Sequence, residues 1–504
     1  MLFNSYAFLF AFLPLTWTGH IVLLRRSECL ATCWLAAASL FFYGWWDYRY
    51  LPLLLLSVLA NFYAARRIAR CDRAAAKKRC LATALTANLL LLVYYKYAAL
   101  LLSTLGLPGR PAAAITLPIG ISFFTFTQIA YLVDCYRGQA GPCRLRHYLL
   151  FVSYFPHLIA GPLLHHADMM PQFAAPCRRW LQRAELHADM SAGLSMLSIG
   201  LAKKVLLADH LAPHAHQLFN SADAPSLLLA WGGVLAYSFQ LYFDFSAYSD
   251  MAIGISRLFG IRLPLNFASP YKAANISVFW RRWHMTLSRF LRDYLYIPLG
   301  GNRHGMARRH AGLMITMVLG GLWHGAGWNF AIWGGLHGLY LMLHHAWRAL
   351  RPASAGRSLS STAAATIANT ALTFGVVSVA WVFFRAPDLD TALRILRGMA
   401  GGVGCALPDA IGHRLGALKP LLEQAGWQFY LGGGERFTGT WSWVLVAALI
   451  AFCMPNTQQI MAGDGGWSRI RWTARPSTAI AIGLLASAGL LSLTTPTAFL
   501  YFQF

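Results

Sequence analysis

The stretch LATALTANLLLLVYYKYAALLLSTL, from Leu81 to Leu105, decides the class of fold. It is long enough to cross the hydrocarbon core of a bilayer, which takes about 20 mostly apolar residues in a helix. Hydrophobic residues make up 57% of the chain and charged residues 12%, against about 45–50% and about 25% in soluble domains. Further apolar windows follow at Ala230–Phe245, Leu313–Trp323, Thr362–Phe384 and Ala479–Leu493. We therefore predict an all-α, polytopic membrane protein with about 10–12 spans rather than a soluble protein with buried helices.

The basic residues, which give a net charge of +24, lie in short runs between the apolar windows. Such runs favour the cytoplasmic side of a membrane. This rule places Arg25–Arg26, Arg66–Arg79, Arg348–Arg357 and Arg469–Arg475 in the cytoplasm. The N-terminus, the segment Arg385–Arg436 and the C-terminus then lie outside. Because the positive charge is not gathered on one face of a domain, we expect no binding of nucleic acid.

We expect one membrane domain with three parts, which are scaffold spans at 1–107, a functional core at 116–347, and C-terminal spans at 348–504 with an external loop at about 385–436. In the core, residues such as Pro118 and Gly161 interrupt apolar stretches that also contain polar residues. Broken helices and polar groups at membrane depth are tolerated only where protein or a water-filled cavity surrounds them. The functional centre is therefore predicted in this part.

Two stretches of the core predict helices that lie along the membrane surface. Cys177–Asp189 is basic and amphipathic, and Asn275–Pro298 mixes aromatic residues with arginines. Both compositions are typical of interfacial helices.

His324 is the first candidate for chemistry, because it is an ionisable residue in the apolar, glycine-rich sequence LGGLWHGAGWNF at 319–330. An ionisable side chain at membrane depth is a functional hypothesis by default. A neutral imidazole can take a proton near neutrality, which suits general-base catalysis. The glycines let a substrate or a neighbouring helix approach closely. The alternative is a structural histidine hydrogen-bonded between helices, which is the interpretation we favour for His337.

His284 is the second candidate, within the sequence FWRRWHMTLS at 279–288. On one continuous helix, Trp280 and His284 would share a face and present aromatic and cationic groups together. Arg281 and Arg282 can hold phosphates of lipid headgroups or of a nucleotide-bearing donor. The alternative interpretation of this segment is an interfacial aromatic belt.

Signatures of other chemistries are missing from the sequence. The pairs His165–His166 and His344–His345 are adjacent rather than spaced along one helix face, so we expect no metal site. Neither a phosphate-binding G-x-x-x-x-G-K-[ST] motif nor a G-x-S-x-G elbow occurs. A membrane transporter would also place polar residues and broken helices at the membrane middle, and it remains an alternative, although no internal repeat is evident.

Several motifs together resemble the membrane-bound O-acyltransferases, and within that family the bacterial alginate O-acetyltransferase type. The resemblance covers nearly the whole chain. Its most specific parts are FWRRWH at 279–284, DYLYIPLGGNR at 293–303 and GLWHG at 321–325. It also includes MLFNSYAFLF at 1–10, LPIGISFFTF at 117–126, YFPHLIAGP at 154–162, YFDFSAYSDMAIG at 242–254 and FLYFQF at 499–504.

The resemblance implies a reaction and its residues. In that family the residue matching His324 is the catalytic histidine, in a central tunnel through the membrane, and the residue matching His284 is the second signature residue. We expect Trp323, Arg281 and Arg282 to contact substrate. The implied reaction passes an acetyl group from a cytoplasmic thioester such as acetyl-CoA across the inner membrane to an exopolysaccharide such as alginate, with no bound cofactor.

The resemblance also implies partners, which are membrane lipid, a periplasmic or membrane-anchored acetyl-transfer protein and a polysaccharide synthesis complex. Transfer of D-alanyl or other acyl groups to a cell-envelope polymer stays open as an alternative. Acylation of a lipid or a protein is likewise left open by the sequence.

Overall fold

The computed structural model describes residues 1–106, 116–174, 178–181, 185–303, 305–350, 362–462, 471–493 and 497–500. Within these residues nearly all secondary structure is helical, which confirms the predicted all-α membrane fold. Parts of Cys177–Asp189 and the last four residues of the terminal motif lie outside the described residues, so the structure does not test those predictions in full.

Six helical segments of the described chain are long and apolar enough to cross a membrane. They include Ala74–Thr104 and Ala363–Arg385, which match two of the apolar windows of the sequence. The segment Glu28–Arg70 contains two helices, because the chain bends at the short 3-10 turn Tyr48–Tyr50. The apolar window near the C-terminus forms the shorter helix α24 (Pro476–Leu491). The protein is thus a multi-pass membrane protein, and ten to twelve spans stay a prediction.

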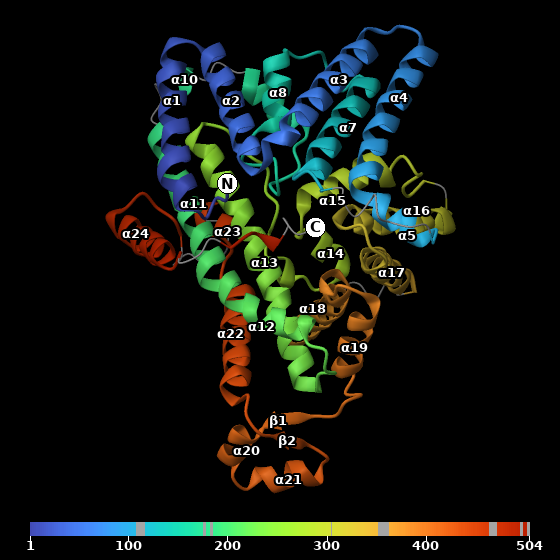
Figure 1. Ribbon diagram of the computed structural model, residues 1–504, viewed down its shortest axis with the longest axis vertical. Helices are drawn as coiled ribbons and strands as arrows, with labels where there is room; N and C mark the ends of the chain where they lie inside the picture. The colour runs from blue at the N-terminus through green and yellow to red at the C-terminus, as the bar shows by residue number, and fades with distance from the viewer. Residues whose placement is uncertain are drawn as a thin grey trace.

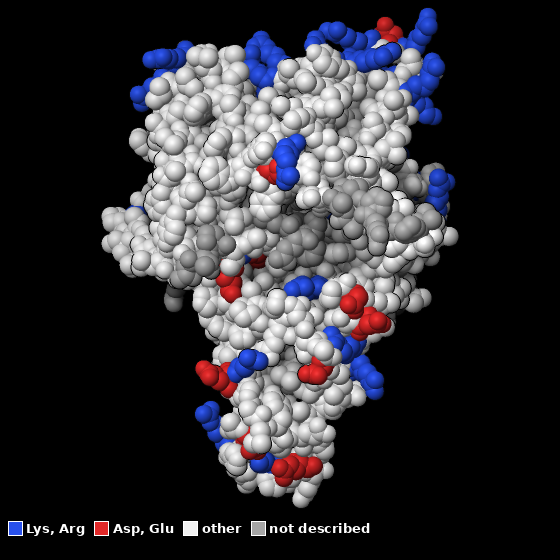
Figure 2. Space-filling model, viewed as in Figure 1, with Lys and Arg blue, Asp and Glu red and all other residues white. Residues whose placement is uncertain are grey.

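The N-terminal helices form a bundle at one end of the molecule (Figure 1). This bundle contains α1 (Leu13–Arg26), α2 (Glu28–Asp47), α3 (Leu51–Arg70), α4 (Ala74–Leu92), α7 (Ile121–Arg137) and α8 (Leu145–Ser153). After a π-helical turn at Val93–Tyr97, α4 continues into α5 (Ala98–Thr104). Lys and Arg gather at the outer edge of this bundle, where the connections between its helices lie (Figure 2).

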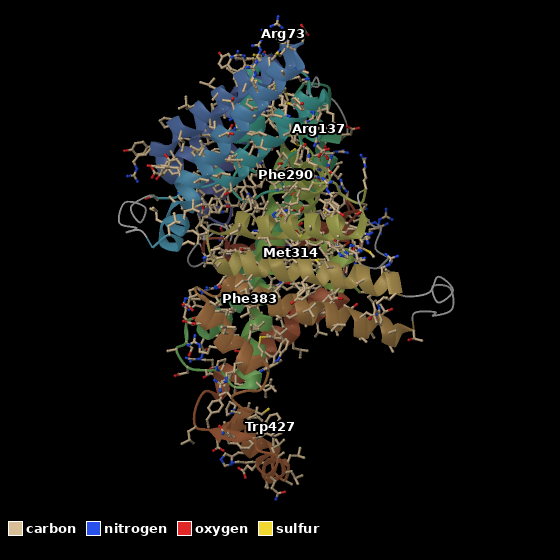
Figure 3. All side chains as sticks on the ribbon, turned by 90° about the vertical axis from the view of Figure 1, so that its right-hand side faces the viewer. Arg73, Arg137, Phe290, Met314, Phe383 and Trp427 are labelled. Carbon is tan, nitrogen blue, oxygen red and sulfur yellow. The ribbon has the colours of Figure 1, made fainter. Side chains whose placement is uncertain are left out.

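The centre of the molecule is built around the long helix α13 (Leu227–Leu258), most of which is buried. It packs against α11 (Glu185–Ala202), α12 (Asp209–Asn220) and α22 (Gly434–Cys453). The helices α16 (Gly305–His324), α17 (Trp328–Leu350) and α18 (Ala363–Arg385) run across the long axis of the molecule (Figure 3). The remaining short helices are α9 (His166–Ala174), α10 (Arg178–Leu181), α14 (Ile276–Trp280), α15 (Met285–Leu291), α19 (Leu389–Met399) and α23 (Thr457–Ala462). Of these, α10 lies near α1 at the outer end of the N-terminal bundle (Figure 1).

A small lobe occupies the end opposite the basic connections, as the labels at Arg73 and Trp427 show (Figure 3). It contains α20 (Asp409–Leu415), α21 (Leu418–Gln424) and two three-residue strands, β1 (Ala406–Pro408) and β2 (Gln428–Tyr430), which pair in parallel. An ion pair links α21 to α20, with 2.7 Å between Lys419 Nζ and Asp409 Oδ1. This lobe lies within the segment Arg385–Arg436, which is predicted to lie outside the membrane.

Close packing of α16 on α17 depends on glycines of both helices. A Cβ atom on Gly321 would overlap the carbonyl oxygen of Phe330, and one on Gly334 would overlap that of Met317. Small residues allow helix backbones to approach closely in membrane proteins. The sequence left open whether a substrate or a neighbouring helix approaches the glycines beside His324. At Gly321 it is a neighbouring helix.

The prediction that Trp280 and His284 share a face of one helix is wrong. Helix α14 ends at Trp280, and His284 has a left-handed backbone with φ of 44° just before α15. The break sends the two side chains to different neighbours, since the Trp280 indole lies against His337 and the His284 ring lies near His324. Asn275–Pro298 is accordingly a broken segment, made of α14, α15 and a π-helical turn at Arg292–Tyr296.

Candidate active site

His324 is the last residue of α16 and is almost completely buried. Its ring is surrounded by aromatic rings, with centroids 4.9 Å away at Trp323, 5.2 Å at Trp333 and 5.2 Å at Phe384. Apolar surroundings disfavour the charged imidazolium, so they hold the ring in the neutral form that can accept a proton.

The structure brings His284 next to His324, with ring centroids 6.3 Å apart. His284 precedes α15 and is fully buried, with the Phe245 ring edge against it at 4.8 Å. A non-glycine residue in the left-handed region costs about 1–3 kcal/mol, and such residues cluster at functional sites. The two histidines, placed by different helices, are close enough to contact one substrate.

Asn266 sets the orientation of the His284 ring. Its Oδ1 atom lies 3.1 Å from His284 Nδ1 and also accepts hydrogen bonds from Thr286, at 3.3 Å from the backbone nitrogen and 3.0 Å from Oγ1. Because this oxygen only accepts, Nδ1 of His284 carries the proton and Nε2 carries the lone pair. His284 in its neutral form can therefore accept a hydrogen bond, or a proton, through Nε2.

A cavity of about 290 Å³ reaches His324. Trp323, Lys96 and Ser122 line it together with His324. Another part of its wall is the segment at 116–120, which precedes α7 and overlaps the motif LPIGISFFTF. Gly120 of this segment has φ of 71°, and a Cβ there would lie 2.7 Å from the Leu158 carbonyl oxygen. The motif thus forms a turn that only glycine fits, and this turn faces the catalytic candidate.

Trp323 connects the histidine pair to a column of stacked aromatic rings. Its ring stacks on Phe126 at 5.5 Å, Phe126 stacks on Phe290 at 4.8 Å, and Phe290 contacts Tyr294 at 5.0 Å between centroids. The column leads from the histidines towards Tyr294, whose ring lies under the Arg137 guanidinium at 5.5 Å. Arg137 lies nearer the basic end of the molecule than Phe290 does (Figure 3).

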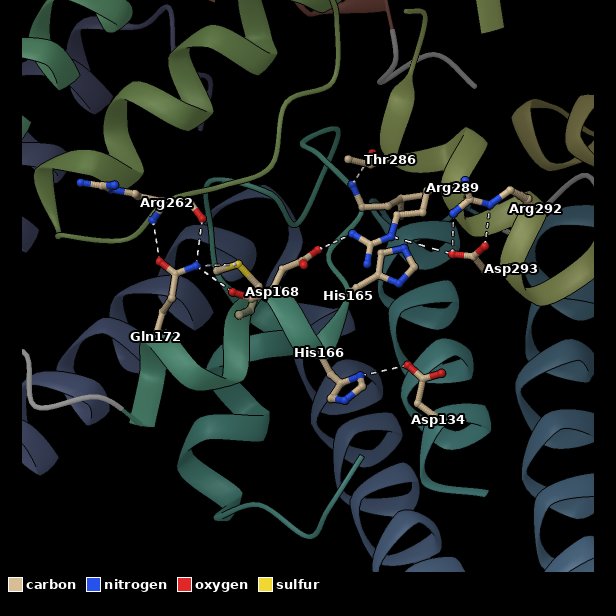
Figure 4. Close-up of polar contacts among 12 residues, drawn as sticks. Asp134, His165, His166, Asp168, Gln172, Arg262, Thr286, Arg289, Arg292 and Asp293 are labelled. Carbon is tan, nitrogen blue, oxygen red and sulfur yellow. Dashed lines mark hydrogen bonds and ion pairs between the residues drawn. The ribbon is translucent and has the colours of Figure 1, made fainter. Parts of the chain in front are cut away.

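A polar cluster at this end of the column was not predicted from the sequence (Figure 4). Asp134 Oδ2 accepts a hydrogen bond from Tyr294 Oη at 2.6 Å and lies 2.9 Å from His166 Nδ1. Burial and this hydrogen bond raise the pKa of Tyr294, so its phenol stays protonated. Burial lowers the pKa of His165, and the charge of Arg289 lowers it further.

The same cluster positions α15, the helix that His284 precedes. Arg289 of α15 forms an ion pair with Asp168 of α9, with 2.8 Å between Nη1 and Oδ2. At the start of α15, Thr286 Oγ1 accepts a hydrogen bond from the Leu163 backbone nitrogen at 2.9 Å (Figure 4). Residues from separate segments of the chain thus meet around α15, and spacing along the chain gave no signal of it.

The two predicted substrate-binding arginines do not line the cavity at His324. Arg281 is exposed and hydrogen-bonds Ser277, 3.3 Å from Nε to the carbonyl oxygen, and Arg282 is half-buried. Of the predicted site residues, His324, His284 and Trp323 therefore lie together, whereas Arg281 and Arg282 lie on the turn between α14 and α15. Their contact with substrate stays a prediction.

His337 has the structural surroundings expected for it. Its Nδ1 accepts a hydrogen bond from the Trp280 indole at 3.3 Å, and aromatic rings enclose it. Within the described residues there is no group of three or more His, Cys, Asp or Glu side chains arranged to hold a metal ion.

Comparison with known proteins shows the family to which the chain belongs. Residues 40–384 match the model of the membrane-bound O-acyltransferase family. The chain is 39% identical to the peptidoglycan O-acetyltransferase of Helicobacter pylori, over 100% of this chain and 98% of the relative. It is 40% identical to a probable alginate O-acetylase of Azotobacter vinelandii, over 79% of this chain and 78% of the relative. A teichoic acid D-alanyltransferase of Streptococcus thermophilus is 29% identical over 45% of this chain and 57% of the relative.

The chain belongs to the membrane-bound O-acyltransferase family and is an O-acyltransferase enzyme. The resemblance inferred from the sequence motifs is confirmed by the family match and by these relatives.

Proposed function

We propose that the protein transfers an acetyl group from a cytoplasmic thioester, such as acetyl-CoA, to a hydroxyl group for O-acetylation of a polysaccharide outside the inner membrane. The observation that carries this proposal is the buried pair of His284 and His324, of which His324 lines the cavity. A neutral, buried imidazole is suited to take a proton from a hydroxyl nucleophile.

His324 acts as the general base in this mechanism. It takes the proton of the acceptor hydroxyl while the hydroxyl oxygen attacks the thioester carbonyl carbon. The new C–O bond forms, the C–S bond breaks, and the proton passes from His324 to the leaving thiolate. An acyl-histidine intermediate is the variant in which the ring itself attacks first.

His284 orients the reacting hydroxyl. Its Nδ1 proton is donated to Asn266, so neutral His284 offers an acceptor at Nε2 and no donor for an oxyanion. This hydrogen bond supports an orienting role for His284 over stabilisation of the oxyanion, which the sequence alone left undecided.

Trp323 supplies the donor for the developing oxyanion. Its indole Nε1 is buried and has no hydrogen-bond partner among the described residues, and its side chain lines the cavity at His324. A fixed N–H donor aimed at the carbonyl oxygen contributes about 10²–10³-fold in rate in other acyl-transfer enzymes. This role is more specific than the prediction from the sequence, which was that Trp323 contacts substrate.

The donor approaches from the basic end of the molecule, and Arg281 and Arg282 bind its phosphates. Positive charge at that end favours the cytoplasmic side. The small lobe then faces the periplasm, with both chain termini on that side. A hydrogen bond of 3.1 Å from Asn4 Nδ2 to the Thr497 carbonyl oxygen holds the two ends of the chain together, which supports a common side.

The acceptor is an exopolysaccharide such as alginate or, as a second candidate, peptidoglycan. The probable alginate O-acetylase of Azotobacter vinelandii supports the first, and the end-to-end match with the Helicobacter pylori enzyme supports the second. Transfer of D-alanyl groups has weaker support, because the D-alanyltransferase matches under half of this chain. The proposed partners are a periplasmic or membrane-anchored acetyl-transfer protein and a polysaccharide synthesis complex, because exported acetyl groups must reach the polysaccharide.

Purified protein in sealed vesicles, supplied with acetyl-labelled acetyl-CoA on the cytoplasmic face, tests the proposal. We expect release of CoA thiol on that face and label on protein or acceptor inside the vesicle, with alginate oligosaccharides and peptidoglycan fragments compared as acceptors. A transporter would move label without cleaving the thioester. Turnover with a D-alanyl thioester but not with acetyl-CoA would replace acetyl by D-alanyl as the transferred group.

A further inference from the structure

Lys96 is a buried lysine at the end of the helix that carries His324. It lies in the π-helical turn Val93–Tyr97, and only 9% of its surface is exposed. Its Nζ atom lies 2.5 Å from the carbonyl oxygen of Trp323, 3.2 Å from that of His324 and 3.3 Å from Ser122 Oγ. An ammonium group has three donors, and these three acceptors match that number.

These contacts provide hydrogen-bond donors for carbonyl groups at the C-terminal end of α16. The last four carbonyl groups of an α-helix have no partner within the helix, and they form the negative end of its dipole. Lys96 serves the carbonyls of Trp323 and His324, while its neighbour Tyr97 donates from Oη to the Leu322 carbonyl oxygen at 2.8 Å. A cation at a helix C-terminus is favourable, and π-helical turns occur often at functional sites.

The position of Lys96 ties three parts of the site together. Its partners belong to α16, which ends at His324, and to the first turn of α7, where Ser122 lines the same cavity. Without Lys96, two carbonyl groups in the last turn of α16 would lose a hydrogen bond each. This turn carries His324, so its position sets the direction of the imidazole ring. A displacement of about 1 Å at a reacting group can lower a rate by about 10²-fold.

We propose that Lys96 is a positioning residue for acyl transfer, which holds the last turn of α16 so that His324 faces the cavity and the His284 ring. The proposal rests on the proposed role of His324 as general base. It predicts that loss of Lys96 lowers turnover rather than donor binding.

The test compares purified Lys96→Met, Lys96→Gln and Lys96→Arg with the wild-type protein in the vesicle assay with acetyl-CoA. We expect kcat to fall by about 10–100-fold for Lys96→Met with KM for acetyl-CoA within about twofold, and Lys96→Arg to recover part of that loss because it keeps the charge. If Lys96→Met does not fold, the comparison of Lys96→Gln with Lys96→Arg decides.

Lys203→Met is the matched control, since Lys203 forms a structural ion pair with Asp250 of 2.8 Å and does not line the cavity at His324. It should lower thermal stability without a comparable fall in kcat. A kcat for Lys96→Met within about threefold of wild type, or an equal loss of kcat in Lys203→Met at the same unfolding temperature, would overturn the proposal. His324→Gln run in parallel separates the two ideas, because activity retained there contradicts the proposed function itself.

Discussion

The imidazole rings of His284 and His324 lie 6.3 Å apart between centroids, and each is fixed from a different direction. Asn266 holds His284 through its ring nitrogen, whereas Lys96 holds the backbone end of the helix that carries His324. The supports are independent, so changes to them should alter the reaction in separable ways.

Replacement of Asn266 should affect stability and turnover together. Asn266→Leu removes the acceptor for the His284 ring and for Thr286, and a buried donor left without a partner costs about 1–3 kcal/mol. We expect a lower unfolding temperature in detergent and a lower kcat for Asn266→Leu. Asn266→Asp, which keeps an acceptor oxygen, should retain more of both. Wild-type stability and turnover in Asn266→Leu would show that His284 is oriented by other groups.

Trp323→Phe tests the indole N–H while keeping an aromatic ring in the stacked column. We expect kcat to fall by about 10²-fold with little change in the unfolding temperature, as for loss of one oxyanion donor. Phe126→Leu is the control, because it disturbs the same column without removing a donor and should cost less kcat. Equal kcat for Trp323→Phe and wild type would remove the indole from the mechanism.

Arg281 and Arg282 should affect donor binding, whereas Arg289 should affect turnover. Replacing Arg281 and Arg282 together with Gln should raise KM for acetyl-CoA more than it lowers kcat, because their predicted partners are donor phosphates. Arg289→Gln should instead lower kcat, since it breaks the ion pair with Asp168 that positions α15 and therefore His284. Steady-state kinetics with varied acetyl-CoA measures both effects. An unchanged KM in the Arg281→Gln/Arg282→Gln protein would exclude these residues from donor binding.

Reporter fusions test the orientation in the membrane. A reporter enzyme that works only in the cytoplasm should be active when fused after Arg79 and inactive when fused after Phe504. The basic runs at the end opposite the small lobe are the physical reason for this orientation. Strong activity from the fusion after Phe504 would reverse the placement of the C-terminus.

The membrane fold could be predicted from the sequence because apolar length is a local property. Leu81–Leu105 and Thr362–Phe384 each contain enough apolar residues to span a bilayer whatever their neighbours are, and both lie in helices that meet this requirement. His324 could be singled out for the same reason, since an ionisable residue in apolar sequence is visible without knowledge of contacts.

The rest of the site depends on contacts between distant segments. The prediction that Trp280 and His284 share a helical face is wrong because His284 takes a left-handed backbone. Three hydrogen bonds from His284 and Thr286 to Asn266 stabilise this conformation. Asn266 itself has no motif that marks it. Lys96 could have been found, because it is an ionisable residue within the apolar stretch Leu81–Leu105, to which the rule used for His324 applies equally.

The most direct test of the central claim, that His324 is the general base, is acyl transfer by purified His324→Gln in vesicles with labelled acetyl-CoA. Gln can still hydrogen-bond but cannot take a proton near neutrality, and a general base contributes about 10²–10⁴-fold in rate. We predict that His324→Gln and His324→Ala both lose transfer by at least about 10²-fold while inserting and folding as wild type does. Near-normal transfer by His324→Gln, together with loss of stability in His324→Ala, would contradict the claim and make His324 a structural residue.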